Sequence, residues 1–342
     1  MAGFVLKRVL PALVAVSLSL YSLQALAQQN LVTVQVPSTA NIQLSPPIPM
    51  PTTNALGRSG ASPFSHLGPG GGGLARGIRY PGDLQYHGGA VLPTTVHHTI
   101  YYNPTSSCPP ITCFGNPITF LSDLSNSRMI HVTDQYVGTT ANNRYPVGTN
   151  YIATANLGTI LTDADMALIA DAVANFSGQF GLGHIYHIFL VPGQDLCFDN
   201  TYTVCYSPDN PATWYFCAYH NSTVDVGNND TVLYTAEPFQ NVNGCAVQPG
   251  TPNGELTDST NNVLSHETFE TITDPVNGSG WNNTNDNGLY GQEIGDECSF
   301  LGYSAGVIVG FGPNYVRLNG KPYAIQPEYS NSQHACSTSL SE

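Results

Sequence analysis

The chain has 342 residues, of which 23 are acidic and 9 are basic, and its formal net charge is −14 at pH 7. A chain this acidic is a poor candidate for binding nucleic acid or anionic membranes, because phosphate binding needs clustered Lys and Arg. Charged residues make up only 9% of the chain, while Gly and Pro number 34 and 25. This composition is typical of a secreted protein that is rich in loops and strands.

Residues 1–27 are expected to be a signal peptide. Lys7 and Arg8 precede an apolar run from Val9 to Leu23, and Ala25-Leu26-Ala27 provides a small-residue cleavage site. No later stretch is long and apolar enough to span a membrane. We therefore expect a secreted, extracellular protein with no membrane span after cleavage of the signal peptide.

Residues 28–85 are expected to be a flexible leader, because they are rich in Pro, Gly and Ser and include a four-glycine run at Gly70–Gly73. Order is expected to begin near Tyr86, and residues 86–342 are expected to form a single α+β domain. The first expected strand is GGAVLPTTVHHTIYYNP, which ends at Pro104. Within it, His97 and His98 are adjacent and should point to opposite faces of a sheet, so we expect ordinary strand residues there.

The clearest helix is LTDADMALIADAVANFSGQFG, in which Thr162 or Asp163 can act as the N-cap and Gly181–Gly183 should end the helix. Apolar residues recur at helical spacing along it: Met166, Ile169, Val173 and Phe176. The next segment, HIYHIFLVP, has apolar residues on both faces, as in a central strand. A helix followed by a buried strand indicates a mixed α/β core.

Further along, TWYFCAYH and TVLYTAEP are strand candidates, and a helix is expected from Thr260 to Thr273, with Pro275 just beyond its end. Near the C-terminus, VIVGFG and YVRLNGKPYAIQPEYSN are expected to form closing hairpins, with the turn at Asn319-Gly320. The predicted fold class is therefore α+β, with a mixed sheet, a metal-motif helix of the zincin type and stabilising disulfides.

Eight cysteines follow the signal peptide, and an even number in an exported chain favours disulfides. Three pairings are plausible from spacing: Cys108 with Cys113, Cys197 with Cys205, and Cys298 with Cys336. The last of these would connect the metal-motif region to the C-terminus. The spacings form no paired CxxC motifs, so a thiolate zinc site is not expected.

The most informative motif is His266-Glu267-x-x-Glu270, which differs by one residue type from the HExxH helix of zinc peptidases. Positions i and i+4 lie on one helical face, so His266 and Glu270 can bind one metal ion. Glu267 would then lie beside the ion as the general base that activates water. Asp274 continues the series, but about 12 Å of helical rise separates it from His266, so it is interpreted as a helix-end residue.

The third metal ligand must come from another segment. Asp296 in GQEIGDEC is the preferred candidate, and Glu293, His220 and His334 remain alternatives. One His and two carboxylates would neutralise Zn²⁺, which makes bound water a weaker acid. Zn²⁺ is the expected cofactor, and the oxygen-rich ligand set also admits Mn²⁺ or Ca²⁺.

The surroundings of the motif support a cation. Acidic residues gather between His266 and Glu297 in a chain otherwise poor in charge, and no Lys or Arg occurs between Arg144 and Arg317. Gathered carboxylates repel one another unless a cation intervenes. A carboxylate pair for glycoside hydrolysis, Glu267 with Glu293 or Asp296, remains open.

Several segments together resemble the phosphate-induced protein 1 family, also called the EXORDIUM-like family: SHETFETITDP, Trp281, EIGDEC, YHGGAVL, TIYYN and EYSN. The resemblance covers residues 85 to 336, and it implies an extracellular protein with a metallopeptidase-like motif. Plant members are secreted to the cell wall and linked to cell expansion. The motif's polar residues match His266, Glu267, Glu270, Asp274, Glu293 and Asp296. The chain departs from the plant pattern in its long leader and in residues 197–245.

The leading hypothesis is a secreted zinc-dependent metallopeptidase-like hydrolase. His266, Glu270 and Asp296 would bind zinc, Glu267 would activate water, and the substrate would be a protein, a peptide or a cell-wall component. The alternative is a non-catalytic extracellular binding or signalling protein in which the same residues hold a structural ion or none.

Overall fold

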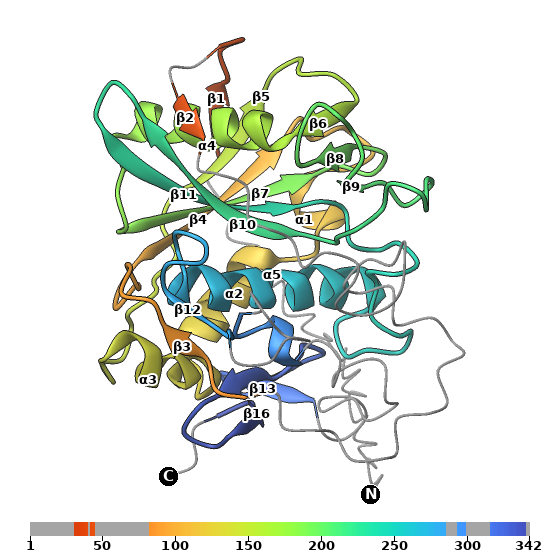
Figure 1. Cartoon of the computed structure of the whole chain (residues 1–342). Coiled ribbons are helices and arrows are strands. Elements are labelled where there is room, and N and C mark those ends of the chain that lie inside the picture. Colours follow the sequence, from red (N-terminus) through yellow and green to blue (C-terminus); the bar gives the residue numbers. More distant parts are fainter. Residues whose placement is uncertain (1–30, 40–41, 45–81, 285–292, 299–314, 340–342) are drawn as a thin grey trace, which may run out of the picture. The chain divides into compact units, whose positions relative to one another are not determined.

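The computed structural model describes residues 31–39, 42–44, 82–284, 293–298 and 315–339. Its centre is a seven-stranded mixed sheet, drawn in Figure 1. Across the sheet the strands are β1 (Leu31–Gln35), β5 (Asn150–Thr154), β4 (Val96–Tyr102), β7 (His184–Leu190), β11 (Asp230–Glu237), β10 (Tyr219–Asp225) and β2 (Ile42–Leu44). The pairs from β1 to β11 are parallel, whereas β10 is antiparallel to both β11 and β2. The expected α+β class with a mixed sheet is confirmed.

Helix α4 (Asp163–Ser177) covers one face of the sheet. Thr162 is its N-cap, one of the two residues that the sequence suggested, and it forms a capping box with Asp165. Met166, Ile169 and Val173 are fully buried against the sheet, but Phe176 is exposed. The helix ends at Gly178, which has a φ of 69°, and not at the later glycines that were expected to end it.

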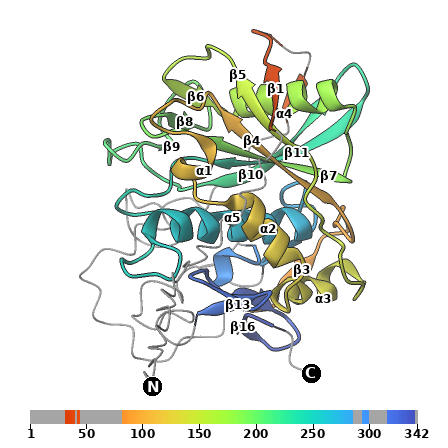
Figure 2. The same ribbon diagram turned by 180° about the vertical axis from the view of Figure 1, so that it is seen from behind.

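Helix α5 (Glu255–Thr273) contacts β10 and β11 on the opposite face, with α2 (Pro117–Ser125) beside it (Figure 2). It begins five residues earlier than expected, and Asp274 is its C-cap, with Pro275 next, as predicted. All residues from 258 to 273 are buried, although most of them are polar. A helix of this composition needs polar partners on every side.

The remaining elements are short. The helical ones are α1 (Pro110–Cys113), the 3₁₀ helix η2 (Met129–Thr133) and α3 (Asp134–Val137). Four small sheets are formed by β3 (Gln85–Tyr86) with β12 (Trp281–Asn282), by β6 (Ile160–Thr162) with β8 (Asp195–Cys197) and β9 (Cys205–Tyr206), by β13 (Val316–Leu318) with β14 (Lys321–Tyr323), and by β15 (Glu328–Ser330) with β16 (Ala335–Ser337). The C-terminal hairpins lie on the side of α5 away from the main sheet (Figure 1).

We expected residues 28–85 to be a flexible leader, and this prediction is wrong for the parts of the segment that form strands. Residues 31–35 and 42–44 form β1 and β2, which are the two edges of the main sheet. The segment LVTVQ has the period-2 alternation of a strand. The prediction missed it because the Pro and Gly residues farther along the segment indicated a flexible leader. Residues 45–81, which include the glycine run, lie outside the described residues.

The other strand predictions are confirmed in part. The segment ending at Pro104 contains β4, and HIYHIFLVP is β7 in the centre of the sheet. TVLYTAEP is β11, but of TWYFCAYH only Tyr219 and His220 are in a strand. The Asn319-Gly320 turn joins β13 to β14, with both residues at positive φ. VIVGFG lies outside the described residues.

The two adjacent histidines of β4 point to opposite faces of the sheet, as predicted. His97 stacks on His187, and His98 stacks on Tyr186, which belongs to the apolar cluster under α4. Neighbouring strand residues alternate between faces, so these two histidines contact different layers of the molecule.

All eight cysteines form disulfides. The three expected pairs, Cys108–Cys113, Cys197–Cys205 and Cys298–Cys336, are present, and Cys217–Cys245 is the fourth. None of the helices in the described residues has the length and apolar character that crossing a membrane requires.

Where α4 packs on the sheet, two buried carboxyl groups share one amide. The Asn175 side-chain amide donates to Asp171 and to Asp225, with 3.1 Å to each oxygen. Burial and the neighbouring Asp225 raise the pKa of Asp171 to about 7. Asp171 therefore holds a proton in the folded protein at pH values where the unfolded chain has lost it.

We predict that Asp171→Asn stabilises the protein at pH 8 but not at pH 4. A raised pKa in the folded state contributes stability below the unfolded pKa of about 3.9, and this contribution is lost as the pH rises through about 7. The amide imitates the protonated carboxyl, so the variant should exceed the wild type at pH 8 by roughly 1–2 kcal/mol. Urea unfolding at both pH values measures the difference, and equal stabilities at pH 8 would contradict the raised pKa of Asp171.

Candidate functional site

Helix α5 brings three motif side chains to one buried face. His266 Nε2 lies 3.0 Å from Glu270 Oε1, which is the i,i+4 contact that the sequence predicted. Glu267 belongs to the same group, since its carboxylate and the donor atoms of His266 and Glu270 all lie within 4.8 Å of one another. Each of these three side chains is at least 94% buried.

The segment from Glu293 to Cys298 packs directly on the His266 ring. A Cβ on Gly295 would come within 2.5 Å of His266 Nδ1, so only glycine allows this approach. Asp296 Oδ1 then lies 3.6 Å from His266 Nε2, and the Asp296 backbone amide donates to Glu270 Oε1 at 3.2 Å. The Asp296 carboxylate is thus in contact with His266, whereas Asp296 contacts Glu270 through its backbone amide. Within the described residues, no group of three donor atoms that all lie within 4.8 Å of one another includes Asp296.

The C-terminal region holds this segment in place. The Tyr329 amide donates to Ile294 O at 3.0 Å, and Gln326 Nε2 donates to Gly295 O at 2.8 Å. The disulfide of Cys298 with Cys336 fixes the end of the segment. The position of Asp296 therefore depends on residues that lie far along the chain from the helix.

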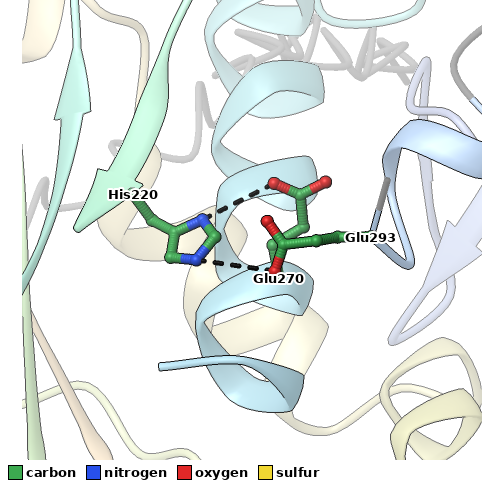
Figure 3. A group of neighbouring side chains, drawn as sticks. All are labelled: His220, Glu270 and Glu293. Atoms are coloured by element: carbon green, nitrogen blue, oxygen red, sulfur yellow. Dashed lines mark ion pairs between the residues drawn. The ribbon is translucent and has the colours of Figure 1, made fainter. Parts of the chain in front are cut away.

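His220 on β10 enters the site from the sheet. Its Nδ1 lies 3.6 Å from both Glu267 Oε2 and Glu270 Oε2, and its Nε2 lies 3.7 Å from Glu293 Oε1 (Figure 3). His220, Glu270 and Glu293 form a second group of donor atoms within 4.8 Å of one another. Two of the alternative ligands therefore belong to the site.

The third alternative, His334, lies outside the site. His334 is 64% exposed, and its Nδ1 lies 3.0 Å from Asp83 Oδ1. Asp274 is a helix-end residue, as expected: its carboxylate accepts hydrogen bonds from the amides of Gly278, Ser279 and Gly280. We call the residues that come together the carboxylate–histidine cluster: His220, His266, Glu267, Glu270, Glu293 and Asp296.

The charges of this cluster are unbalanced. Within the described residues, the glutamates of the cluster form ion pairs with His220 and His266. Arg144 and Lys321 pair instead with acids outside the cluster, Asp134 and Asp123. Burying carboxylates without an equal positive charge is strongly unfavourable. The protein must therefore bind protons or a cation here.

The pKa values show the same imbalance. Burial by itself lowers the pKa of His220 and His266, but the adjacent carboxylates raise both well above the usual value. Burial by itself raises the pKa of Glu270, yet the two imidazoles outweigh it and lower that pKa to about 2. For Glu293, burial dominates and raises the pKa well above its usual value.

Sequence reasoning missed two buried acids beside the cluster. Glu237 at the end of β11 accepts a hydrogen bond from Thr235 Oγ1, and burial followed by the charge of Glu267 raises its pKa. Glu328 is fully buried, and neither of its carboxylate oxygens has a hydrogen-bond partner in the described part of the chain. Glu328 is part of the EYSN segment, which was the one sequence signal that pointed to it.

A row of polar side chains crosses the sheet toward the cluster. Thr99, His187, Thr235 and His220 pair in register on four neighbouring strands. His187 Nδ1 lies 2.9 Å from Thr235 Oγ1, and its Nε2 lies 2.9 Å from His97 Nδ1. Burial lowers the pKa of both His97 and His187, which favours neutral imidazoles. Through Thr235, hydrogen bonds connect these imidazoles to Glu237.

Comparisons of the chain with protein-family models, with curated proteins and with solved structures found no match.

We predict that removing the Cys298–Cys336 disulfide loosens the segment that carries Asp296. The bond closes a separation of 38 residues, so replacing both cysteines with Ala should cost about 2–4 kcal/mol of stability. Hydrogen–deuterium exchange of a peptide covering residues 293–298 should speed up at the same time.

The matched control is the Cys197→Ala, Cys205→Ala variant, whose disulfide spans 8 residues and joins β8 to β9. It should leave exchange of residues 293–298 unchanged. Equal exchange of this peptide in the wild type and in both variants would show that the Cys298–Cys336 bond does not hold the segment.

Proposed function

We propose that this protein is a secreted, divalent-cation-dependent hydrolase with a zincin-like site. His266, Glu270 and Asp296 would hold the cation, for which Zn²⁺ is the first candidate, and Glu267 would act as the general base. The observation that carries the proposal is the buried excess of carboxylates around His266 on a helix that has the HExxE spacing.

The distances from His266 to each of the two carboxylates fit a metal ion. An ion about 2.1 Å from two donors, with an angle of roughly 90–120° between them, keeps those donors roughly 3.0–3.6 Å apart. His266 Nε2 lies 3.0 Å from Glu270 Oε1 and 3.6 Å from Asp296 Oδ1. The three side chains come from two segments that disulfide and backbone contacts fix against each other.

The chemistry follows from the positions of the side chains. A bound divalent cation would polarise a substrate carbonyl and acidify water. Glu267 follows His266 on the helix, and its buried carboxylate is suited to accept a proton from water next to His266 and Glu270. Asp296 is 30% exposed, so substrate would approach from its side of the cluster.

The substrate class rests on the motif and on the resemblance to the EXORDIUM-like family. A peptide bond in an extracellular protein or peptide is the first candidate, and a cell-wall component is the second. Four disulfides are consistent with an extracellular, oxidising compartment.

A second candidate function has its own support. His220, Glu267 and Glu270 are almost completely enclosed, with side chains 1–6% exposed. A cation surrounded in this way by several carboxylates would be largely neutralised and would acidify water weakly. This favours a structural ion in a non-catalytic extracellular binding or signalling protein.

We predict that the purified wild-type chain carries at least one equivalent of divalent metal and that His266→Ala loses metal, as elemental analysis would measure. Glu267→Gln should keep its metal but lose peptide hydrolysis by about 10²-fold or more, since only the base is removed. Hydrolysis is measured on a mixture of unfolded extracellular proteins, because no single substrate is assumed.

His334→Ala is the control, because this exposed histidine lies outside the cluster and should leave metal content unchanged. A wild-type protein without stoichiometric metal would refute the cation site. Metal without any hydrolysis, together with unfolding on chelation, would favour the structural ion. Hydrolysis that survives Glu267→Gln would refute the role of the base.

A further inference from the structure

We propose that the carboxylate–histidine cluster is a two-cation centre, in which Glu270 bridges one ion held with His266 and a second ion held with His220. This inference rests on the proposed function, because it takes the cation site as given and doubles it. The second ion would be a divalent cation of the class that accepts imidazole and carboxylate ligands, such as Zn²⁺ or Mn²⁺.

Glu270 lies between two imidazoles that come from different elements. Its Oε1 is 3.0 Å from His266 Nε2 on the same helix, and its Oε2 is 3.6 Å from His220 Nδ1 on β10. Each oxygen of one carboxylate therefore faces a different nitrogen donor. This is the arrangement of a carboxylate that bridges two metal ions.

Each histidine has a further carboxylate of its own. Asp296 Oδ1 lies 3.6 Å from His266 Nε2. Glu293 Oε1 lies 3.7 Å from His220 Nε2, the ring nitrogen that also lies 3.1 Å from Asp274 O, and it approaches from the side opposite β10 (Figure 3). The cluster therefore offers one set of ligands around His266 and another around His220.

The grouping of the donor atoms separates the two sets. His266, Glu267 and Glu270 form one group within 4.8 Å, and His220, Glu270 and Glu293 form the other. Glu270 is the member that the two groups share, and no such group in the described ranges contains both histidines. Glu267 Oε2 also lies 3.6 Å from His220 Nδ1, so Glu267 is near both sets. A single ion contacting all ligands at about 2.1 Å cannot serve two such sets, whereas two ions about 3.5–4 Å apart can.

A separate observation also points to additional positive charge. Glu328 on β15 is fully buried, has no hydrogen-bond partner for either oxygen within the described residues, and interacts electrostatically with His266, Glu270 and Asp296. Glu293 Oε1 likewise accepts no hydrogen bond within the described part of the chain. Buried carboxylates without hydrogen bonds are rare unless they pair with a cation.

The total charge favours two ions over one. Four carboxylates lie within 3.7 Å of the two histidines: Glu267, Glu270, Glu293 and Asp296. Glu328 also interacts electrostatically with His266. One divalent cation offsets two of the negative charges of these carboxylates, while two cations offset four. With two ions, the substrate carbonyl and the attacking water can be held by different sets of ligands, which is a recurring arrangement in hydrolases.

The test is metal stoichiometry and metal–metal coupling in the full mature chain. After chelation and dialysis, the wild type titrated with Zn²⁺ alone should bind two equivalents. Titrated with Mn²⁺ alone, it should give the electron paramagnetic resonance spectrum of an exchange-coupled pair. His220→Ala should bind one equivalent and lose the coupled spectrum, since the ligand set around His266 is intact.

His98→Gln is the matched control, because His98 is buried on the opposite face of the sheet and should keep two equivalents. One equivalent in the wild type, or two that are not coupled, would overturn the two-cation centre and leave the proposed single site standing. No binding in the wild type would refute both. Two equivalents in folded His220→Ala would also overturn the proposal, and the wild-type spectrum decides the question if that variant fails to fold.

Discussion

The structure depends on one energetic constraint, which is that a polar helix is completely buried. Residues 258–273 of α5 lie between the main sheet and the C-terminal hairpins, yet the helix has little apolar surface to contribute. Its stability must therefore come from satisfied polar groups. Asp258 accepts hydrogen bonds from Asn253, and Asn262 accepts one from the Gln326 backbone amide, so loop and C-terminal residues satisfy these two side chains in the first half of the helix.

Three side chains in the second half of α5 cannot be satisfied in this way, because they are ionisable. His266, Glu267 and Glu270 meet further acids from the sheet and from the C-terminal region, and the two imidazoles are too few to balance them. The proposed cation would resolve this conflict, and it would also account for the convergence of segments that lie far apart in the sequence. Under this proposal, the disulfide at Cys298 and the close approach of Gly295 would place carboxylates around the ion.

Much of the fold could be predicted from local patterns. The 3.6-residue period and the Thr162 cap predicted α4, and the apolar run predicted β7. The HExxE spacing predicted that His266 and Glu270 lie on one face of α5. The strands β1 and β2 were missed because their short alternating pattern lies in a Pro- and Gly-rich segment. The contribution of Glu237 and Glu328 could not be predicted, because it depends on long-range packing that no local spacing encodes. Asp296 could be preferred to His220 only narrowly, for the same reason.

The central claim is that the buried charge of α5 is balanced by a bound divalent cation. Crystals of the full mature chain, grown without added metal, can be measured with X-rays just above and just below the absorption edge of each metal found in the sample. The account predicts an anomalous difference peak about 2.0–2.2 Å from a carboxylate oxygen of Glu270. A well-ordered Glu270 with no anomalous peak near it, in protein that is folded and stable, would contradict the account.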